Sequence, residues 1–122
     1  EDKVLDHVFG GVAYTAPTTH YVALYTVAPT DTGGGTEVTG GSYARQTSTF
    51  TVSGTSPTTA TNAAAVEYPT ATADYGTVVA VGIMDALTSG NLLAYANLDT
   101  SKVVSNGDVF RFDASDLDIT LA

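Results

Sequence analysis

The chain contains no cysteine among its 122 residues. Thiol catalysis, cysteine-ligated zinc and a disulfide framework are therefore excluded, and the redox compartment stays open. A fold without such cross-links depends on core packing, on pairing between strands or on association with other chains.

Positive charge is also scarce. Four Lys and Arg residues stand against 13 Asp and Glu residues, which gives a net charge of −9. Binding to nucleic acid or to an anionic membrane surface requires clustered cations, and these four are scattered. We therefore expect neither nucleic acid nor a membrane as a partner, and we interpret the scattered acids as a charged, soluble surface.

Long apolar runs are missing too. No stretch approaches the roughly 20 residues of a membrane-spanning helix, and no basic segment followed by an apolar one opens the chain. The length suits one domain with a buried core, so we predict a single domain over residues 1–122.

The first strong pattern that is present covers residues 20–26. These residues are mostly β-branched, aromatic or apolar, and they lie between Pro17 and Pro29. This is typical of a buried strand and too short for a convincing helix. We take this predicted strand as the organising element of the fold.

A glycine-rich loop follows the strand directly. The run Asp31-Thr32-Gly33-Gly34-Gly35, and then Gly40-Gly41, allows positive φ angles before an extended pattern resumes. Arg45 stands at the far end, and we predict that it pairs with Glu37 or Asp31 and pins the base of the loop. Residues 30–42 are the best candidate for a surface that contacts a neighbouring chain.

The only helical pattern lies at the N-terminus, within residues 1–10. Asp2 can cap the first turn, Leu5 and Val8 share a side with Val4, and Gly10-Gly11 ends the helix. So short a helix is marginal alone in water. We expect it to dock, on its own domain in preference to a neighbouring subunit.

Further strand patterns recur about every ten residues, as in all-β sandwiches. They cover residues 49–52, 64–68, 77–84, 92–98, 102–104, 109–112 and 117–121. Residues 77–84 are apolar on both faces, which predicts a central strand in a hairpin with 92–98. Alternation in 117–121 directs three apolar residues inward, an Asn106-Gly107 turn precedes 109–112, and residues 53–62 are predicted to form a loop.

These patterns predict an all-β fold. We expect a single antiparallel β-sandwich of about eight strands, with jelly-roll or Greek-key connections and a short N-terminal helix. Such connections are preferred over a closed barrel.

The sequence offers no catalytic set. Gly54-Thr55-Ser56-Pro57 lacks the second glycine of a nucleophile elbow, and we interpret the only histidines, His7 and His20, as partly buried structural side chains. The glycines after Asp31 lack the Gly-Lys-Ser/Thr signature of a phosphate-binding loop. No motif selects a carboxylate pair for glycoside hydrolysis. We expect no catalytic residue, no cofactor and no enzyme activity.

Acidic residues gather near the C-terminus, at Asp108, Asp113, Asp116 and Asp118. Calcium prefers oxygen ligands, but the spacing is not that of an EF-hand loop and the central glycine is missing. We favour a solvated acidic edge over a weak or structural calcium site, and we expect calcium to do little.

The aromatic residues are seven Tyr and four Phe, without Trp. Most tyrosines lie in or beside predicted strands, where we expect core or rim packing. Tyr43 and Tyr75 lie beside glycine-rich turns, so we predict that these two are exposed contacts. The predicted interaction residues are Asp31, Gly33, Gly34, Gly35, Glu37, Tyr43, Arg45 and Tyr75.

Several segments together carry a family resemblance, most specifically the block of residues 14–45. The others include residues 5–11, 69–73, 75–78 and 82–86. Through them, nearly the whole chain resembles a family of small proteins encoded among the virion structural genes of tailed bacteriophages and prophages, commonly labelled tail-fibre-like. The resemblance brings no catalytic residues with it.

The resemblance implies a virion protein assembled in the bacterial host cytoplasm, with capsid or tail subunits as partners. Strand edges and a docking helix favour a homo-oligomer or binding to a lattice. We predict a non-enzymatic structural protein that serves as a capsid decoration, a head-fibre base or a tail-fibre appendage. The alternatives are a receptor- or glycan-binding module that contacts host surface glycan and, with less support, a glycan-cleaving enzyme.

Overall fold

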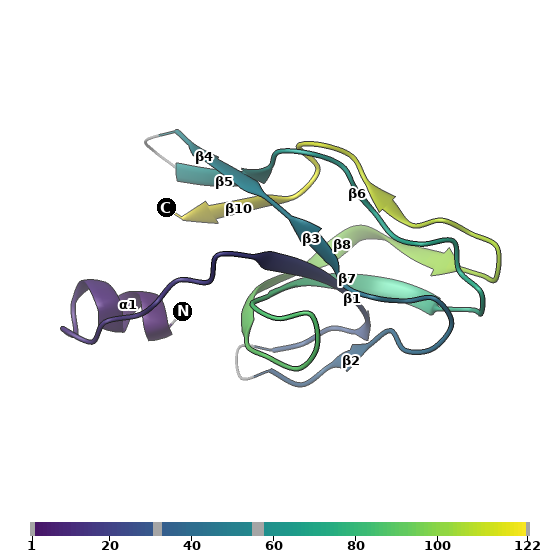
Figure 1. Ribbon diagram of the computed structural model, residues 1–122, viewed down its shortest axis with the longest axis horizontal. Helices are drawn as coiled ribbons and strands as arrows, with labels where there is room; N and C mark the ends of the chain where they lie inside the picture. Colours follow the sequence, from purple (N-terminus) through teal and green to yellow (C-terminus); the bar gives the residue numbers. More distant parts are fainter. Residues whose placement is uncertain (1, 31–32, 55–57, 122) are drawn as a thin grey trace.

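The computed structural model describes residues 2–30, 33–54 and 58–121. In these ranges the chain forms one short helix, α1 (Asp2–Val8), and a series of antiparallel strands (Figure 1). The strands are β1 (His20–Val27), β2 (Thr36–Glu37), β3 (Gln46–Ser48), β4 (Phe50–Ser53), β5 (Thr58–Asn62), β6 (Val66–Glu67), β7 (Gly76–Met84), β8 (Leu92–Val104), β9 (Arg111–Phe112) and β10 (Asp118–Leu121). No helix in the described part of the chain is long and apolar enough to cross a membrane.

The main sheet is built around β1, as the sequence predicted. β1 pairs antiparallel with β7, with Ala23 opposite Gly82, and β7 pairs with β8 on its other side. The predictions of a central strand and of a hairpin with the next strand are therefore confirmed. The other edge of β1 pairs with two short strands, β2 and β3, which follow one another along it.

Two smaller antiparallel sheets complete the fold: β5 lies between β4 and β10, and β6 pairs with β9. Their side chains and one face of the main sheet enclose the core, so the predicted all-β antiparallel sandwich is confirmed, divided into several sheets (Figure 1). The largest fully buried side chains are those of Val22, Leu24, Asn62, Val66, Tyr68 and Val78.

Asn62 is the polar member of this buried set, and its amide explains why. Its Nδ2 donates to the carbonyl oxygens of Ala64 and Asp113 at 2.9 Å each, and its Oδ1 accepts from Leu117 N at 2.8 Å. A buried amide is tolerated when its groups are paired. Asn62 thereby fastens the end of β5 to the segment that leads into β10.

The opposite face of the main sheet carries a smaller cluster formed by Ala23, Tyr25, Ala80 and Met84. Gly82 lies under this cluster, where an added Cβ would be 2.8 Å from both Leu92 Cδ1 and Tyr25 Cε2. The missing side chain is therefore what lets the Tyr25 ring lie across β7.

The prediction of a loop over residues 53–62 is wrong for its second half, which forms β5. This stretch is rich in Thr and Ala and has no apolar alternation, so the pattern suggested a loop. It is a strand because it has a partner on each side, with Thr61 opposite Thr51 of β4 and opposite Asp118 of β10. Backbone pairing, rather than side-chain hydrophobicity, makes this segment extended.

Two more expectations need correction near the C-terminus. The strands predicted at residues 92–98 and 102–104 are one strand, β8, which continues through an irregularity in its pairing with β7. In β10, Ile119 is exposed although Leu117 before it is buried, because Ile119 lines an open groove. The turn at Asn106-Gly107 is present, and it leads to β9.

The histidines have separate outcomes. His20 is half-buried and meets the Phe50 ring edge-on, with centroids 5.9 Å apart, as expected of a structural side chain. His7 is exposed, so its predicted partial burial is wrong; its Nδ1 accepts a hydrogen bond from Tyr14 N at 3.1 Å.

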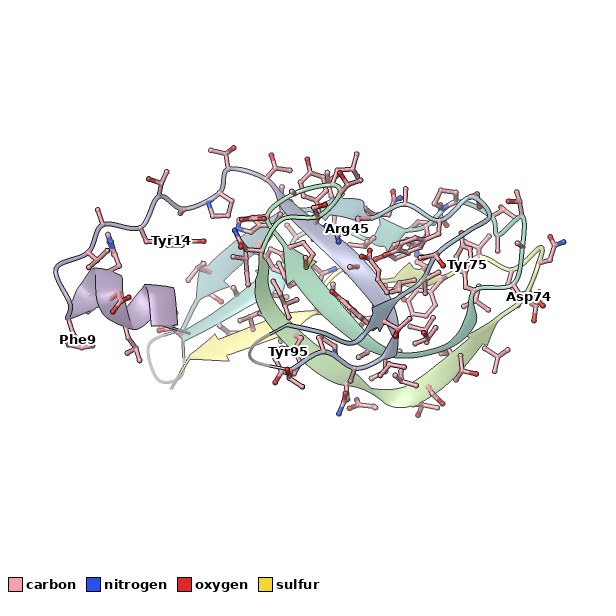
Figure 2. The ribbon with its side chains drawn as sticks, turned by 90° about the horizontal axis from the view of Figure 1, so that it is seen from below. Phe9, Tyr14, Arg45, Asp74, Tyr75 and Tyr95 are labelled. Carbon is pink, nitrogen blue, oxygen red and sulfur yellow. The ribbon has the colours of Figure 1, made fainter. Side chains whose placement is uncertain are left out.

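Helix α1 forms as predicted, but its expected docking on its own domain is wrong. Residues 5–13 are all exposed, and Phe9 is 83% exposed. Figure 2 shows Phe9 and Tyr14 on an N-terminal segment that extends away from the sheets. Residues 11–19 join α1 to β1 without helix or strand pairing up to Thr19.

Candidate functional site

The site begins at a gap along the edge of β1, between its partners β2 and β3. Two tyrosine hydroxyls fill this gap: Leu24 N donates to Tyr43 Oη at 3.0 Å, and Tyr68 Oη donates to Val22 O at 2.7 Å. Buried backbone groups need such partners where a strand is missing. The segment between β2 and β3 can therefore leave the sheet without leaving β1 unsatisfied.

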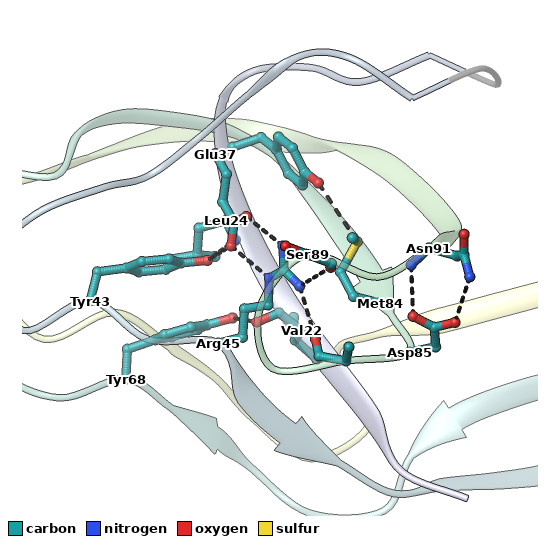
Figure 3. Close-up of polar contacts among 12 residues, drawn as sticks. Val22, Leu24, Glu37, Tyr43, Arg45, Tyr68, Met84, Asp85, Ser89 and Asn91 are labelled. Carbon is teal, nitrogen blue, oxygen red and sulfur yellow. Dashed lines mark hydrogen bonds and ion pairs between the residues drawn. The ribbon is translucent and has the colours of Figure 1, made fainter. Parts of the chain in front are cut away.

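Glu37 of β2 and Arg45, just before β3, meet across this gap (Figure 3). Arg45 Nη2 lies 2.7 Å from Glu37 Oε1, and Arg45 Nε donates to Glu37 Oε2 at 2.9 Å. The geometry is bidentate, which is the strong form of this pair. The predicted pairing of Arg45 with Glu37 is confirmed, whereas Asp31 lies outside the described residues.

This ion pair is more buried than a surface salt bridge. The side chain of Arg45 is 8% exposed and that of Glu37 is 23% exposed. Removing one partner of a buried pair leaves an uncompensated charge, which costs far more than breaking a surface pair.

Arg45 also holds a second loop, residues 85–91, which joins β7 to β8. Its Nη1 donates to Ala86 O at 2.8 Å and to Ser89 O at 2.7 Å. Ser89 has a φ of 54°, a left-handed conformation that directs its carbonyl within this tight turn. One guanidinium therefore joins the strand β2 to the β7–β8 turn.

The same turn is closed by its own end residues. Asp85 Oδ1 accepts from Asn91 N at 2.7 Å, and Asp85 Oδ2 accepts from Asn91 Nδ2 at 2.9 Å (Figure 3). Gly90 has a φ of 78°, and an added Cβ would lie 2.5 Å from Asp85 Oδ1. The hydrogen bonds from Asn91 hold the pKa of Asp85 below its ordinary value.

The ionisation of the central residues follows from their contacts. Burial disfavours the charged form of Glu37, but hydrogen bonds from Arg45 and Tyr43 outweigh it, and the pKa of Glu37 is lowered. Burial first, and then the hydrogen bond to Glu37, raise the pKa of Tyr43 well above its ordinary value. The hydrogen bond to Glu37 raises the pKa of Arg45. At neutral pH the site therefore holds a fixed carboxylate, a fixed guanidinium and a protonated phenol.

A cavity of about 370 Å³ lies between the two loops. Its lining consists of Tyr25, Gly33, Gly34, Met84, Gly90, Asn91 and Leu92. We call residues 33–37 and 85–91 the two-loop surface, because Arg45 links them and this cavity lies between them.

The glycine predictions agree with the structure. Gly33, Gly34 and Gly35 have φ angles of 98°, 78° and 73°. At Gly35 an added Cβ would lie 2.6 Å from Val27 O, so this position also needs glycine for space. The glycine run is what allows the loop to fold back toward the sheet.

The predicted exposure of Tyr43 and Tyr75 is wrong. Tyr75 is 5% exposed within the core, and Tyr43 is partly buried against it. The two rings meet edge-to-face with centroids 5.7 Å apart, and Tyr43 also stacks on Tyr68 at 6.0 Å. Both rings point inward although they lie beside glycine-rich turns, because ring stacking and hydrogen bonds of their hydroxyls stabilise them there. Both residues support the site from below and are not part of its surface.

The C-terminal acids are held separately. Asp108 Oδ2 accepts from Ser105 N, Asp116 Oδ2 accepts from Asp113 N, and Asp118 Oδ1 accepts from Thr61 Oγ1, at 2.9, 3.1 and 2.8 Å. Among the described residues, no group of three or more His, Asp or Glu side chains is positioned to hold a metal ion.

Sequence reasoning missed the contribution of the β7–β8 turn. Ser89 and Asn91 lie between the strands predicted at residues 77–84 and 92–98, and Asp85 directly follows the first of these strands; no role was predicted for any of the three. An acid and an amide six residues apart around a Ser-Gly pair were the available signal, since Asp and Asn side chains commonly close such turns. The backbone carbonyls that Arg45 binds have no sequence signature.

Together the fold and this site define a small all-β module whose buried charges are used to hold two surface loops. A protein-family model described as Podophage GP4 fiber I protein gp80 matches residues 1–120. The chain therefore belongs to this family of phage fibre proteins, and it is a virion protein, as the resemblance to virion structural proteins indicated. No curated protein matches the chain.

Proposed function

We propose that the chain is a non-enzymatic structural subunit of the phage particle, and that it attaches to other virion proteins through the two-loop surface. The observation that carries the proposal is that Arg45 binds Glu37, in β2 at the end of one loop, and also binds two carbonyl oxygens in the other loop.

The chemistry of the site supports a structural role. A general acid or base needs a pKa near the working pH and access to a substrate. The pKa of Glu37 is lowered and both of its oxygens accept hydrogen bonds from Arg45 or Tyr43, while the pKa of Tyr43 is raised. These groups hold their protons and their charges fixed, which is what a structural support requires.

The fixed conformation of the two loops supports a binding role. A surface that is already held in place loses little conformational entropy when it binds. Leu87 lies in this surface and is 51% exposed, so it offers apolar contact area beside hydrogen-bonding backbone groups. We infer that capsid or tail subunits, and further copies of this chain, are the partners, with assembly in the host cytoplasm.

The experiment compares two exposed apolar positions at opposite ends of the β7–β8 hairpin. Leu87 lies in the turn, and Val103 is opposite Thr77 at the far end, where it is 69% exposed. Phage carrying Leu87→Glu should contain at least about tenfold less of this protein per particle by quantitative mass spectrometry, whereas Val103→Glu should match wild type. Circular dichroism of the purified proteins checks that both fold.

Equal incorporation of the two variants would contradict attachment through the two-loop surface. A copy number of only a few per particle would contradict a decorating subunit and favour a fibre appendage.

A second candidate function is glycan binding, which the cavity beside Tyr25 and Asn91 favours. Sugar sites combine an aromatic side chain with amide and backbone hydrogen-bonding groups, and this cavity has both kinds. Host surface polysaccharide should then bind the isolated protein, and Asn91→Ala should abolish binding. Absence of binding at millimolar glycan concentrations would exclude this alternative.

A further inference from the structure

The N-terminal arm, residues 5–19, carries an apolar stripe that its own domain leaves uncovered. Leu5, Val8, Phe9 and Val12 are each more than half exposed. Leu5, Val8 and Phe9 are spaced as on one helical face, because Phe9 N still donates to Leu5 O at the end of α1, and Val12 follows after the glycines that end the helix. So short a helix needs a surface to pack against. Figure 2 shows this segment standing apart from the sheets.

An apolar groove of about 580 Å³ lies between the main sheet and the sheet of β4, β5 and β10. Its apolar lining consists of Phe50, Val52, Ala60, Ile83, Leu93, Ala94 and Ile119. The remaining lining residues are Thr, Ser and one His, so the groove presents no acid in a chain that has 13. An acidic segment can enter it without like-charge repulsion.

A second observation at the groove concerns Ser48. Its side chain is buried, and among the described residues its Oγ has no hydrogen-bond partner. Burying an unpaired hydroxyl is unfavourable, and native proteins rarely do so. Ser48 is therefore an incompletely satisfied polar residue in the wall of the groove.

We propose that the N-terminal arm of one copy of this chain packs into the groove of a second copy. Every copy carries both surfaces, so an exchange covers the stripe and the groove together. The groove carries no acid to repel Asp6 of the incoming arm.

The direction of the arm favours a second copy over its own groove. Thr18 and Thr19 form part of the rim, so the arm leaves its own domain there. Pro17 restricts the backbone just before that point, and entry into the same groove would require the chain to reverse direction within these residues. Residues 11–19 can span about 30 Å, which is enough to reach a neighbouring molecule without reversal.

This inference deepens the self-association part of the proposed function. Attachment to the particle through the two-loop surface does not depend on it.

The test uses the absence of native cysteine. Phe9→Cys and Val52→Cys are made in separate copies, mixed and oxidised; Phe9 lies on the stripe and Val52 in the groove, and both are exposed. We expect a disulfide-linked dimer in the mixture, above the background from each variant alone. Phe9→Cys mixed with Val103→Cys is the control and should give background only.

Two outcomes of the cross-linking would overturn the inference. One is a mixture that gives no more cross-linking than the control. The other is a double variant, Phe9→Cys with Val52→Cys in one chain, that closes only within the monomer, since this would mean that the arm occupies its own groove.

Sedimentation gives an independent readout of the same contact. Wild type should sediment as an oligomer and Phe9→Glu as a monomer, while Val103→Glu should keep the wild-type mass. A wild-type monomer at every concentration would overturn the inference. If that monomer still entered particles and Leu87→Glu did not, the proposed function would stand alone.

Discussion

The hydroxyl of Tyr43 donates to Glu37 Oε2 at 2.7 Å and, from the other side, accepts a hydrogen bond from Leu24 N at 3.0 Å. One phenol therefore completes the edge of β1 and orients the carboxylate that binds Arg45. The strand at the centre of the main sheet and the two-loop surface are connected through this atom, so the stability of one depends on the other.

Removing this hydroxyl should destabilise the fold. Tyr43→Phe leaves Leu24 N without its acceptor and removes a donor from Glu37, and we expect a loss of about 1–3 kcal/mol in the free energy of unfolding. Urea denaturation measures it. Tyr14→Phe removes an equivalent hydroxyl from the N-terminal arm and should change stability by less than about 0.5 kcal/mol; equal losses in the two variants would contradict the role of Tyr43.

Arg45 should matter far more than the other described arginine. Arg45→Ala leaves the Glu37 carboxylate without its cation, and we expect a loss of about 3–5 kcal/mol. Arg111 is half-exposed and pairs with Glu67 and Asp113 at 3.7 and 2.9 Å. Arg111→Ala should cost about 0–1 kcal/mol.

Hydrogen exchange separates this local effect from a general one. In Arg45→Ala, amide protection should fall in both 33–42 and 85–91, because Arg45 binds both loops. Unaltered protection in the two loops would show that Arg45 does not hold them.

Stability should depend on pH through Glu37. Its pKa in the fold lies below the ordinary value of 4.5, so its contribution is fully present above that value and is lost as the pH falls through the lowered pKa. The stability difference between wild type and Glu37→Gln should therefore stay constant from neutral pH down to the ordinary value of 4.5 and shrink as the pH falls further. Glu67→Gln, at an exposed glutamate, controls for the loss of one negative charge. A difference between wild type and Glu37→Gln that stays constant with pH would contradict the account.

Two glycines test how the β7–β8 turn is built. Gly90 and Gly107 both have positive φ, 78° and 94°, but an added Cβ meets Asp85 Oδ1 at 2.5 Å only at Gly90 and meets nothing within 4 Å at Gly107. Gly107→Ala should cost about 1 kcal/mol, from backbone strain alone, and Gly90→Ala about 2 kcal/mol or more. Thermal unfolding measures both. Equal losses of stability in the two variants would contradict the close contact between position 90 and Asp85.

The sequence predicted the main sheet because its central strands are apolar on both faces. β1 and β7 lie among buried neighbours, so their side-chain patterns record their positions. β5 could not be predicted in the same way, since its Thr and Ala side chains are compatible with a loop and only its partners β4 and β10 make it a strand. Whether α1 docks likewise cannot be predicted from the residues of α1 alone, because docking depends on a surface formed by residues far away in the chain.

The candidate site was predictable in part. Arg45 is one of four cations in an acidic chain, and this scarcity indicated a pair with Glu37 or Asp31, of which the structure shows the pair with Glu37. The burial of the pair was not predicted, and Tyr43, which lies beside it, was expected to be exposed. Tyr43 is drawn inward by Leu24 N and by Glu37, and a partner that is a backbone group leaves no trace in the sequence.

The most direct test of the account is solvent-accessibility footprinting of the protein, free and in purified particles. If the two-loop surface attaches the subunit to the virion, protection in the particle should rise at residues 33–37 and 85–91 and stay unchanged at the Asn106-Gly107 turn. Protection that rises elsewhere while both loops stay as accessible as in the free protein would contradict the account.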